Sequence, residues 1–239
     1  MANPSAAMIV IGDEILSGRT RDINAHVLAE ALTARGIDLV EVRMITDDHA
    51  RIVATVQDLS AMVDHVFTSG GIGPTHDDIT ADAVAAAFGT QIEVRADARA
   101  ILEAFYAERD IEMNAARLRM ARIPDGATLI DNPVSKAPGF SLQNVHVMAG
   151  VPKIFSAMLD GLLPSLSAGT PVISETIRVE RPEGEVAAHV GAVAEAHPEV
   201  SVGCYPFNEN GKLGCNLVLR GFEPAALKEA ASALTRALS

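Results

Sequence analysis

The sequence of 239 residues contains no tryptophan, and aromatic residues make up only 4% of it. Surfaces that bind nucleic acid by stacking bases on aromatic rings are therefore not expected. Basic residues are also scarce, because 19 lysines and arginines stand against 31 aspartates and glutamates, a net charge of −12. General nucleic-acid binders hold phosphates with lysine and arginine, so this balance argues against one. A local pocket for a small phosphorylated ligand remains compatible with it.

Long hydrophobic runs and cysteines are few as well. The apolar run at 8–11 is far too short to span a bilayer, and no basic region precedes it. We therefore expect no signal peptide and no membrane association, and we predict a cytoplasmic protein. Cys204 and Cys215 could face each other across a hairpin, but a reduced pair is the better interpretation in that compartment. Apolar residues still make up 49% of the chain, enough for a packed core.

Alternating strand and helix patterns predict an α/β fold for the first part of the chain. Apolar strand-like runs at 8–11, 37–45 and 63–68 are separated by helical patterns at 22–35 and 50–62. Such strand–helix–strand units predict a mostly parallel sheet with helices on both faces. Ligands of these sheets bind beyond the carboxyl ends of the strands. Polar segments that follow the strands are therefore the candidates for a site.

The pattern changes after the segment 168–171, which reads Ala-Gly-Thr-Pro. The elements that follow it are expected in the order β-α-β-β-α, which suggests an antiparallel sheet. We predict an α/β domain at residues 1–168 and a small α+β domain at residues 169–239.

The most informative segment is 68–80, TSGGIGPTHDDIT, between the third predicted strand and an alanine-rich helical pattern. Its three glycines permit a sharp turn and close approach of a ligand, and the free N–H groups of the next helix favour an anion. Asp77 and Asp78 are unsuited to an anion site unless a cation lies between, most simply Mg²⁺. The segment therefore suggests a phosphate or pyrophosphate handled with a metal. The alternative is an ordinary turn in which Asp78 only caps the helix.

A second acidic pair, Asp13 and Glu14, follows the first predicted strand. Parallel strands bring their carboxyl ends to one edge, so this pair is expected to share a site with the glycine segment. Glu14, Asp77 and Asp78 are the predicted metal ligands and catalytic residues. A merely solvated acid pair at a helix start is the alternative for Glu14.

Three segments resemble the CinA family. Residues 70–80 resemble its signature Gly-Gly-Leu-Gly-Pro-Thr-x-Asp-Asp-x-Thr, a variant of the loop in MogA/MoaB-type molybdopterin-binding domains. Residues 12–24 look like its Gly-x-Glu-Leu-x-x-Gly…Asn segment, and residues 132–140 like Asn-Pro-x-x-x-Ala-Pro-Gly-Phe. The similarity covers residues 6–168 strongly, and the N-terminal half of eukaryotic FAD synthases carries a similar domain. At 150–152 the chain departs from the usual Pro-Gly-Pro-Pro, which leaves ligand contacts by those prolines in doubt.

The resemblance implies a MogA/MoaB-like fold, a homo-oligomer, and a role for Asp78, which matches an aspartate important for metal insertion in the wider family. It also implies two classes of function: binding of molybdopterin or its adenylated form, or Mg²⁺-dependent hydrolysis of a pyrophosphate in ADP-ribose or a related dinucleotide. A non-catalytic scaffold is a third alternative. The family's C-terminal amidohydrolase domain is not expected here, because the chain has no room for it.

Several loop residues have a structural alternative beside the functional one. Asn24 either contacts a ligand or caps a helix. Asp48 is expected to cap a helix, and the family resemblance also makes it a candidate site residue. Lys136 either reaches a phosphate or is an ordinary surface lysine. The candidate ligand-binding residues are Gly12, Asn24, Asp48, Gly70, Gly71, Gly73, Thr75, Lys136 and Gly150. Neither a Walker loop nor a supported Ser-His-Asp arrangement is apparent, which argues against covalent catalysis.

Overall fold

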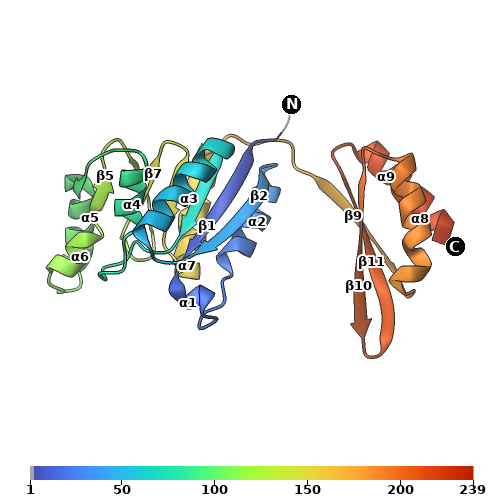
Figure 1. Cartoon of the computed structure of the whole chain (residues 1–239), viewed down its shortest axis with the longest axis horizontal. Helices are drawn as coiled ribbons and strands as arrows, with labels where there is room; N and C mark the ends of the chain where they lie inside the picture. Colours follow the sequence, from blue (N-terminus) through green and yellow to red (C-terminus); the bar gives the residue numbers. More distant parts are fainter. Residues whose placement is uncertain (1–2, 239) are drawn as a thin grey trace. The chain divides into compact units, whose positions relative to one another are not determined.

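The computed structural model describes residues 3–238, and the chain forms two compact units that divide between Gly169 and Thr170 (Figure 1). The first unit holds a six-stranded sheet in the order β2-β1-β3-β8-β7-β6. Strands β2, β1, β3 and β8 are parallel, whereas β7 and β6 join antiparallel at one edge. The predicted mostly parallel α/β sheet is confirmed. The strands are β1 (Ser5–Ile11), β2 (Asp38–Ile45), β3 (His65–Ser69), β6 (Thr128–Ile130), β7 (Gly139–Leu142) and β8 (Val145–Met148).

Helices cover both faces of this sheet. The side chains of Ala6, Met8 and Val10 pack with α2 (Asn24–Thr33) and α7 (Pro152–Leu162), which a short 3₁₀ turn at Leu163–Ser165 extends. The alternate side chains of β1 pack on the other face with α3 (His49–Met62), α4 (Thr80–Ala87) and α5 (Ala96–Ala107). Because β1 is buried on both faces, its sequence is a continuous apolar run rather than an alternating pattern.

Three short elements were not predicted from the sequence. Helix α1 (Asp13–Leu16) follows β1 directly, and the strands β4 (Ile92–Val94) and β5 (Arg122–Pro124) form a separate antiparallel pair. Each has three or four residues, too few to show a periodic pattern. Helix α6 (Ala115–Arg119) lies just before β5 in the chain.

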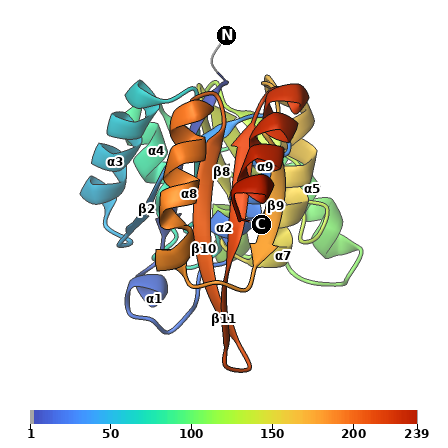
Figure 2. The ribbon, with the colours of Figure 1, turned by 90° about the vertical axis from the view of Figure 1, so that its right-hand side faces the viewer.

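The second unit is a three-stranded antiparallel sheet, β10-β11-β9, with two helices packed on one face. Figure 2 shows these helices, α8 and α9, side by side along β10 and β11. Cys204 and Cys215 lie on these neighbouring strands as free thiols. The elements are β9 (Ile173–Val179), α8 (Glu183–Ala196), β10 (Ser201–Glu209), β11 (Lys212–Gly221) and α9 (Pro224–Leu238).

None of the helices in residues 3–238 combines the length and the apolar character that crossing a bilayer requires.

Candidate functional site

A cleft of about 560 Å³ lies in the first unit, at the carboxyl ends of the parallel strands. The segments that follow β1, β2, β3 and β8 all contribute to it, and so does the loop between β6 and β7. The three sequence segments that resemble one family therefore meet at one place. The lining residues are Ile11, Gly12, Glu14, Thr20, Asp47, Gly70, Gly71, Ile72, Gly73, Pro74, Asp77, Asp78, Met120, Asn132, Ser135, Ala137, Ala149, Gly150, Val151, Pro152 and Ile154.

The glycine loop owes its shape to packing inside the protein. Gly70 and Gly71 have backbone φ angles of 110° and 68°, which residues other than glycine rarely adopt. A Cβ on Gly70 would overlap the carbonyl oxygen of Ile11, and one on Gly71 would overlap the Oγ1 of Thr80. Thr80 Oγ1 donates to the carbonyl of Gly70, and its backbone N–H to that of Gly71, each at 3.0 Å. The start of α4 therefore fixes the loop before any ligand binds.

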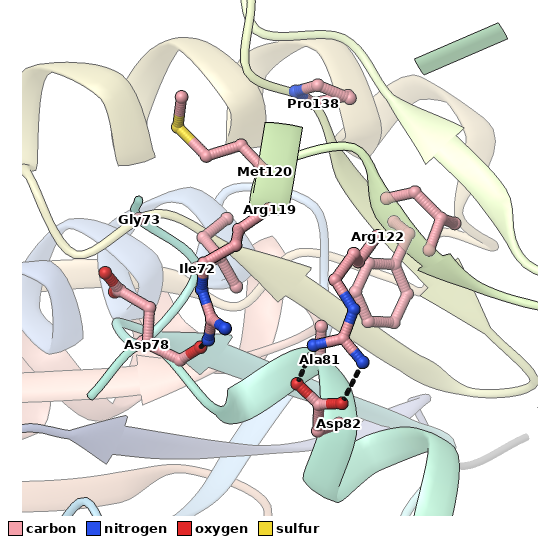
Figure 3. Close-up of a pocket in the computed structure, with 12 residues that line it drawn as sticks. Ile72, Gly73, Asp78, Ala81, Asp82, Arg119, Met120, Arg122 and Pro138 are labelled. Atoms are coloured by element: carbon pink, nitrogen blue, oxygen red, sulfur yellow. Dashed lines mark hydrogen bonds and ion pairs between the residues drawn. The ribbon is translucent and has the colours of Figure 1, made fainter. Parts of the chain in front are cut away.

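The carboxylate of Asp78 does not cap α4, so the capping interpretation is wrong. The N-cap of α4 is Ile79, which makes no side-chain capping bond. Asp78 Oδ2 instead accepts hydrogen bonds from the backbone N–H and the hydroxyl of Thr75, at 2.8 and 2.5 Å. Arg119 Nη2 donates to the Asp78 carbonyl at 3.2 Å (Figure 3). Thr75 and Arg119 together hold Asp78 in place, and Asp78 lines the cleft.

The cleft is strongly acidic. Glu14, Asp47, Asp77 and Asp78 line it, and none of the described residues that line it is a lysine or arginine. Burial raises the pKa of Asp47; a hydrogen bond from the Asp13 backbone N–H, at 2.9 Å, opposes this shift, and the charges of Asp13, Glu14 and Asp77 add to it. The carboxylates therefore lie close enough together to disfavour further negative charge in the cleft.

A divalent metal would have to share its ligands with a bound molecule. No group of three or more His, Cys, Asp or Glu side chains in residues 3–238 is arranged to hold a metal ion. Mg²⁺ in phosphate sites usually takes one or two carboxylates and completes its octahedral shell with phosphate oxygens and water. The hard oxygen donors of the cleft would suit that mode of binding.

The structure divides the predicted site residues into two groups. Those that line the cleft are Gly12, Glu14, Gly70, Gly71, Gly73, Asp77, Asp78 and Gly150, and those that do not are Asn24, Asp48, Thr75 and Lys136. Asp48 is the N-cap of α3, accepting from the Arg51 backbone N–H at 2.8 Å, while its neighbour Asp47 lies in the cleft. Lys136 Nζ lies 3.9 Å from the Asp131 carboxylate.

Asn24 does not cap α2, whose N-cap is Ile23. Asp22 caps this helix start, since its carboxylate accepts from the N–H groups of Asn24 and Ala25. The Asn24 side chain is 3% exposed, and its Nδ2 donates to Ser69 Oγ at 2.7 Å and to the Gly150 carbonyl at 2.8 Å. It therefore links the end of β3 to Gly150, which follows β8 and lines the cleft.

Two arginines that contact the glycine loop and the helix after it were not predicted as site residues from the sequence. Arg122 forms a paired ion bridge with Asp82 on α4, at 2.7 and 2.5 Å, and Arg119 bonds the loop itself (Figure 3). They border a small cavity of about 20 Å³, room for one water molecule. These partners are about forty residues apart in the chain, so no local pattern reveals them. Asp47, Thr20, Met120, Asn132 and Ser135 also line the cleft without having been predicted as site residues.

A parallel sheet with a glycine loop and an acidic cleft at its carboxyl edge defines an α/β ligand-binding domain. Residues 7–168 match the family described as a probable molybdopterin binding domain, and the chain belongs to that family. Residues 171–239 match the middle domain of FAD synthase.

Relatives of this chain carry the names that the sequence resemblance implies. A CinA-like protein of Citrifermentans bemidjiense is 33% identical over 244 residues, which cover 98% of this chain and 58% of that protein. A probable FAD synthase of Caenorhabditis briggsae is 32% identical, over 86% of this chain and 44% of that protein. The crystal structure of the protein CinA from Thermoplasma acidophilum has a TM-score of 0.63 and 31% identity, covering 69% of this chain and 99% of that one. The resemblance to CinA and FAD synthases is confirmed.

Proposed function

We propose that the cleft binds a phosphorylated pterin, either molybdopterin or its adenylated form, together with a divalent metal ion. The observation that carries this proposal is the pairing of a glycine loop before a helix with a lining of four carboxylates and no lysine or arginine. The glycine loop suits an anion. The carboxylates repel one, so a cation such as Mg²⁺ is needed between them.

The size and lining of the cleft suit such a ligand. A volume of about 560 Å³ lies within the range of small-molecule sites. Apolar groups such as Ile11, Ile72, Met120 and Ile154 line part of it, next to the acidic groups. A flat heterocycle can pack on the apolar part while its phosphate and metal lie at the glycine loop. The family description supports a pterin as that heterocycle.

The second candidate is a Mg²⁺-dependent pyrophosphatase acting on ADP-ribose or a related dinucleotide. This candidate is favoured by the four carboxylates of the cleft, because Mg²⁺ bound at a phosphate usually takes only one or two. The surplus leaves a carboxylate such as Asp47 able to accept a proton from water as that water attacks phosphorus and the bridging P–O bond breaks. The similarity of residues 171–239 to a FAD synthase domain supports an adenylated ligand in either case.

The decisive experiment is to purify the full chain from cells with Mg²⁺ present and identify the released small molecules by mass spectrometry. A pterin supports the binder, and hydrolysis of added ADP-ribose that stops with EDTA supports the enzyme. Glu14→Gln should reduce either activity, whereas Glu30→Gln on the exposed surface of α2 is the matched control. If neither pterin nor ADP-ribose binds in calorimetry, both proposals fail and a non-catalytic scaffold is favoured.

A further inference from the structure

A second cavity of the first unit, about 500 Å³ in volume, lies between β6, β7 and β8 and the C-terminal end of α7. It shares no lining residue with the acidic cleft. Its wall combines leucine and isoleucine side chains with two serines, a threonine and a histidine, and Asp131 is its one charged group among the described lining residues. The lining residues are Thr128, Leu129, Ile130, Asp131, Ser141, His146, Gly161, Leu162, Ser165 and Leu166.

Three side chains form a continuous hydrogen-bonded line into this cavity. Ser141 Oγ lies 2.8 Å from His146 Nδ1, and His146 Nε2 lies 3.1 Å from His65 Nδ1. The sheet register creates the line, because Ser141 pairs with His146 across β7 and β8, and β8 pairs with β3, which begins at His65. In enzymes with an activated nucleophile, a hydroxyl group lies next to a base, and a third group orients that base. Ser141, His146 and His65 have this arrangement.

The surroundings favour the neutral form of both rings. Burial lowers the pKa of His146 to about 4, and the neighbouring charge of His65 adds to this. Burial also lowers the pKa of His65, while the adjacent carboxylate of Asp64 opposes the shift. Two sets of neutral tautomers satisfy both contacts, and in one of them Ser141 donates its proton to His146 Nδ1 while His146 donates from Nε2 to His65 Nδ1. His146 is then a free base at its serine side.

We propose that this cavity is a second reactive site, in which Ser141 is a nucleophile and His146 its general base for acyl transfer from small, uncharged esters. Ser141 Oγ attacks the ester carbonyl while its proton moves to His146 Nδ1. The protonated ring returns that proton to the departing alcohol, which leaves an acyl group on Ser141. Water then attacks the acyl carbonyl as His146 Nδ1 takes its proton. The ring returns this proton to Ser141 Oγ as the acyl–oxygen bond breaks, which releases the carboxylic acid and restores the serine hydroxyl. His65 is a positioning residue that holds the His146 ring through Nε2.

The chemistry of the cavity sets the substrate class and the rate. Apolar side chains from Leu129, Leu162 and Leu166 suit a short acyl chain, and Asp131 disfavours an anionic substrate. Because its pKa is low, His146 is a weak base. We therefore expect general-base catalysis to raise the rate by only about a hundredfold, the lower end of its usual range. Covalent labelling is therefore a more sensitive measurement than turnover.

Helix α7 supplies a variant that blocks the cavity without touching the reacting groups. Gly161 lies on its wall, and a Cβ at this position would meet no atom within 4 Å. Gly161→Phe should fill the cavity, whereas Gly161→Ala should leave it open and favour the helix.

The experiment is to treat the full chain at pH 7.5 with a fluorophosphonate probe and locate the label by peptide mass spectrometry. We expect a label on Ser141 that Ser141→Ala and Gly161→Phe abolish and that Gly161→Ala and Ser156→Ala, on α7 but outside the cavity lining, retain. The burst of p-nitrophenol from p-nitrophenyl acetate should disappear with the same variants. His65→Asn, which keeps an acceptor, should label faster than His65→Leu.

Thermal melts of each variant establish that it is folded. A folded wild-type chain that takes no label on Ser141, or labelling that Gly161→Phe leaves unchanged, would overturn the proposal. Labelling requires neither Mg²⁺ nor a pterin, so this result is independent of the function proposed for the acidic cleft.

Discussion

Replacing Gly71 with alanine tests whether the glycine loop is shaped by its own packing. The added methyl would overlap the Oγ1 of Thr80, at a backbone φ of 68° that alanine resists. Thr80 is fully buried and bonds the loop carbonyl of Gly70 through that same oxygen, at 3.0 Å. Relief of the overlap must therefore disturb a buried hydrogen bond.

The expected loss of stability is the sum of two effects. A non-glycine residue in the left-handed region costs about 1 to 2 kcal/mol. A buried hydrogen bond broken with its acceptor left unpaired costs about 1 to 3 kcal/mol. Gly71→Ala should therefore lower the free energy of unfolding by about 2 to 5 kcal/mol. From the sequence alone, a loss of on the order of 1 kcal/mol would be expected, from the φ penalty of the turn.

A double-mutant cycle with Thr80→Ala isolates the overlap. Thr80→Ala alone should cost about 1 to 2 kcal/mol, because it removes the donor to Gly70. In the double variant the overlapping oxygen is gone, so the combined loss should be smaller than the sum of the single losses by at least about 1 kcal/mol. Urea unfolding of the four proteins measures this coupling. Strictly additive losses would refute the claim that Thr80 shapes the loop.

Further predictions concern the cleft, acid stability and the division into two units. Glu14→Gln and Asp78→Asn should each weaken Mg²⁺-dependent ligand binding by on the order of a hundredfold with little change in melting temperature, and unchanged calorimetric affinity would contradict a shared site. The pKa of His146 is about 4 in the folded chain against 6.5 normally, so the unfolded chain takes up the proton first as the pH falls. Stability should therefore drop by about 3 kcal/mol between pH 6.5 and 4, and His146→Gln should show a correspondingly smaller drop in urea unfolding. A chain ending at Ala168 should keep ligand binding in calorimetry, and a folded one that does not bind would assign cleft residues to the second unit.

The sequence alone determined the features that depend on neighbours in the chain. The doubly buried strand at 8–11 and the helix that starts after Asp48 follow from local apolar patterns and one capping residue. The glycine loop can also be predicted from the sequence, because residues with positive φ in a tight turn are usually glycine. The meeting of the acidic pair at 13–14 with the glycine segment at one sheet edge followed from parallel topology, since all parallel strands end on the same side.

Tertiary structure alone decided which side chain of each segment enters a site. Asp47 rather than Asp48 lines the cleft, because the capping bond to α3 turns Asp48 away from it. His65 and His146 are 81 residues apart, and only the pairing of β3 with β8 brings their rings into contact. Local propensity is a property of a few adjacent residues, whereas such contacts depend on strand order and register, which long-range packing sets.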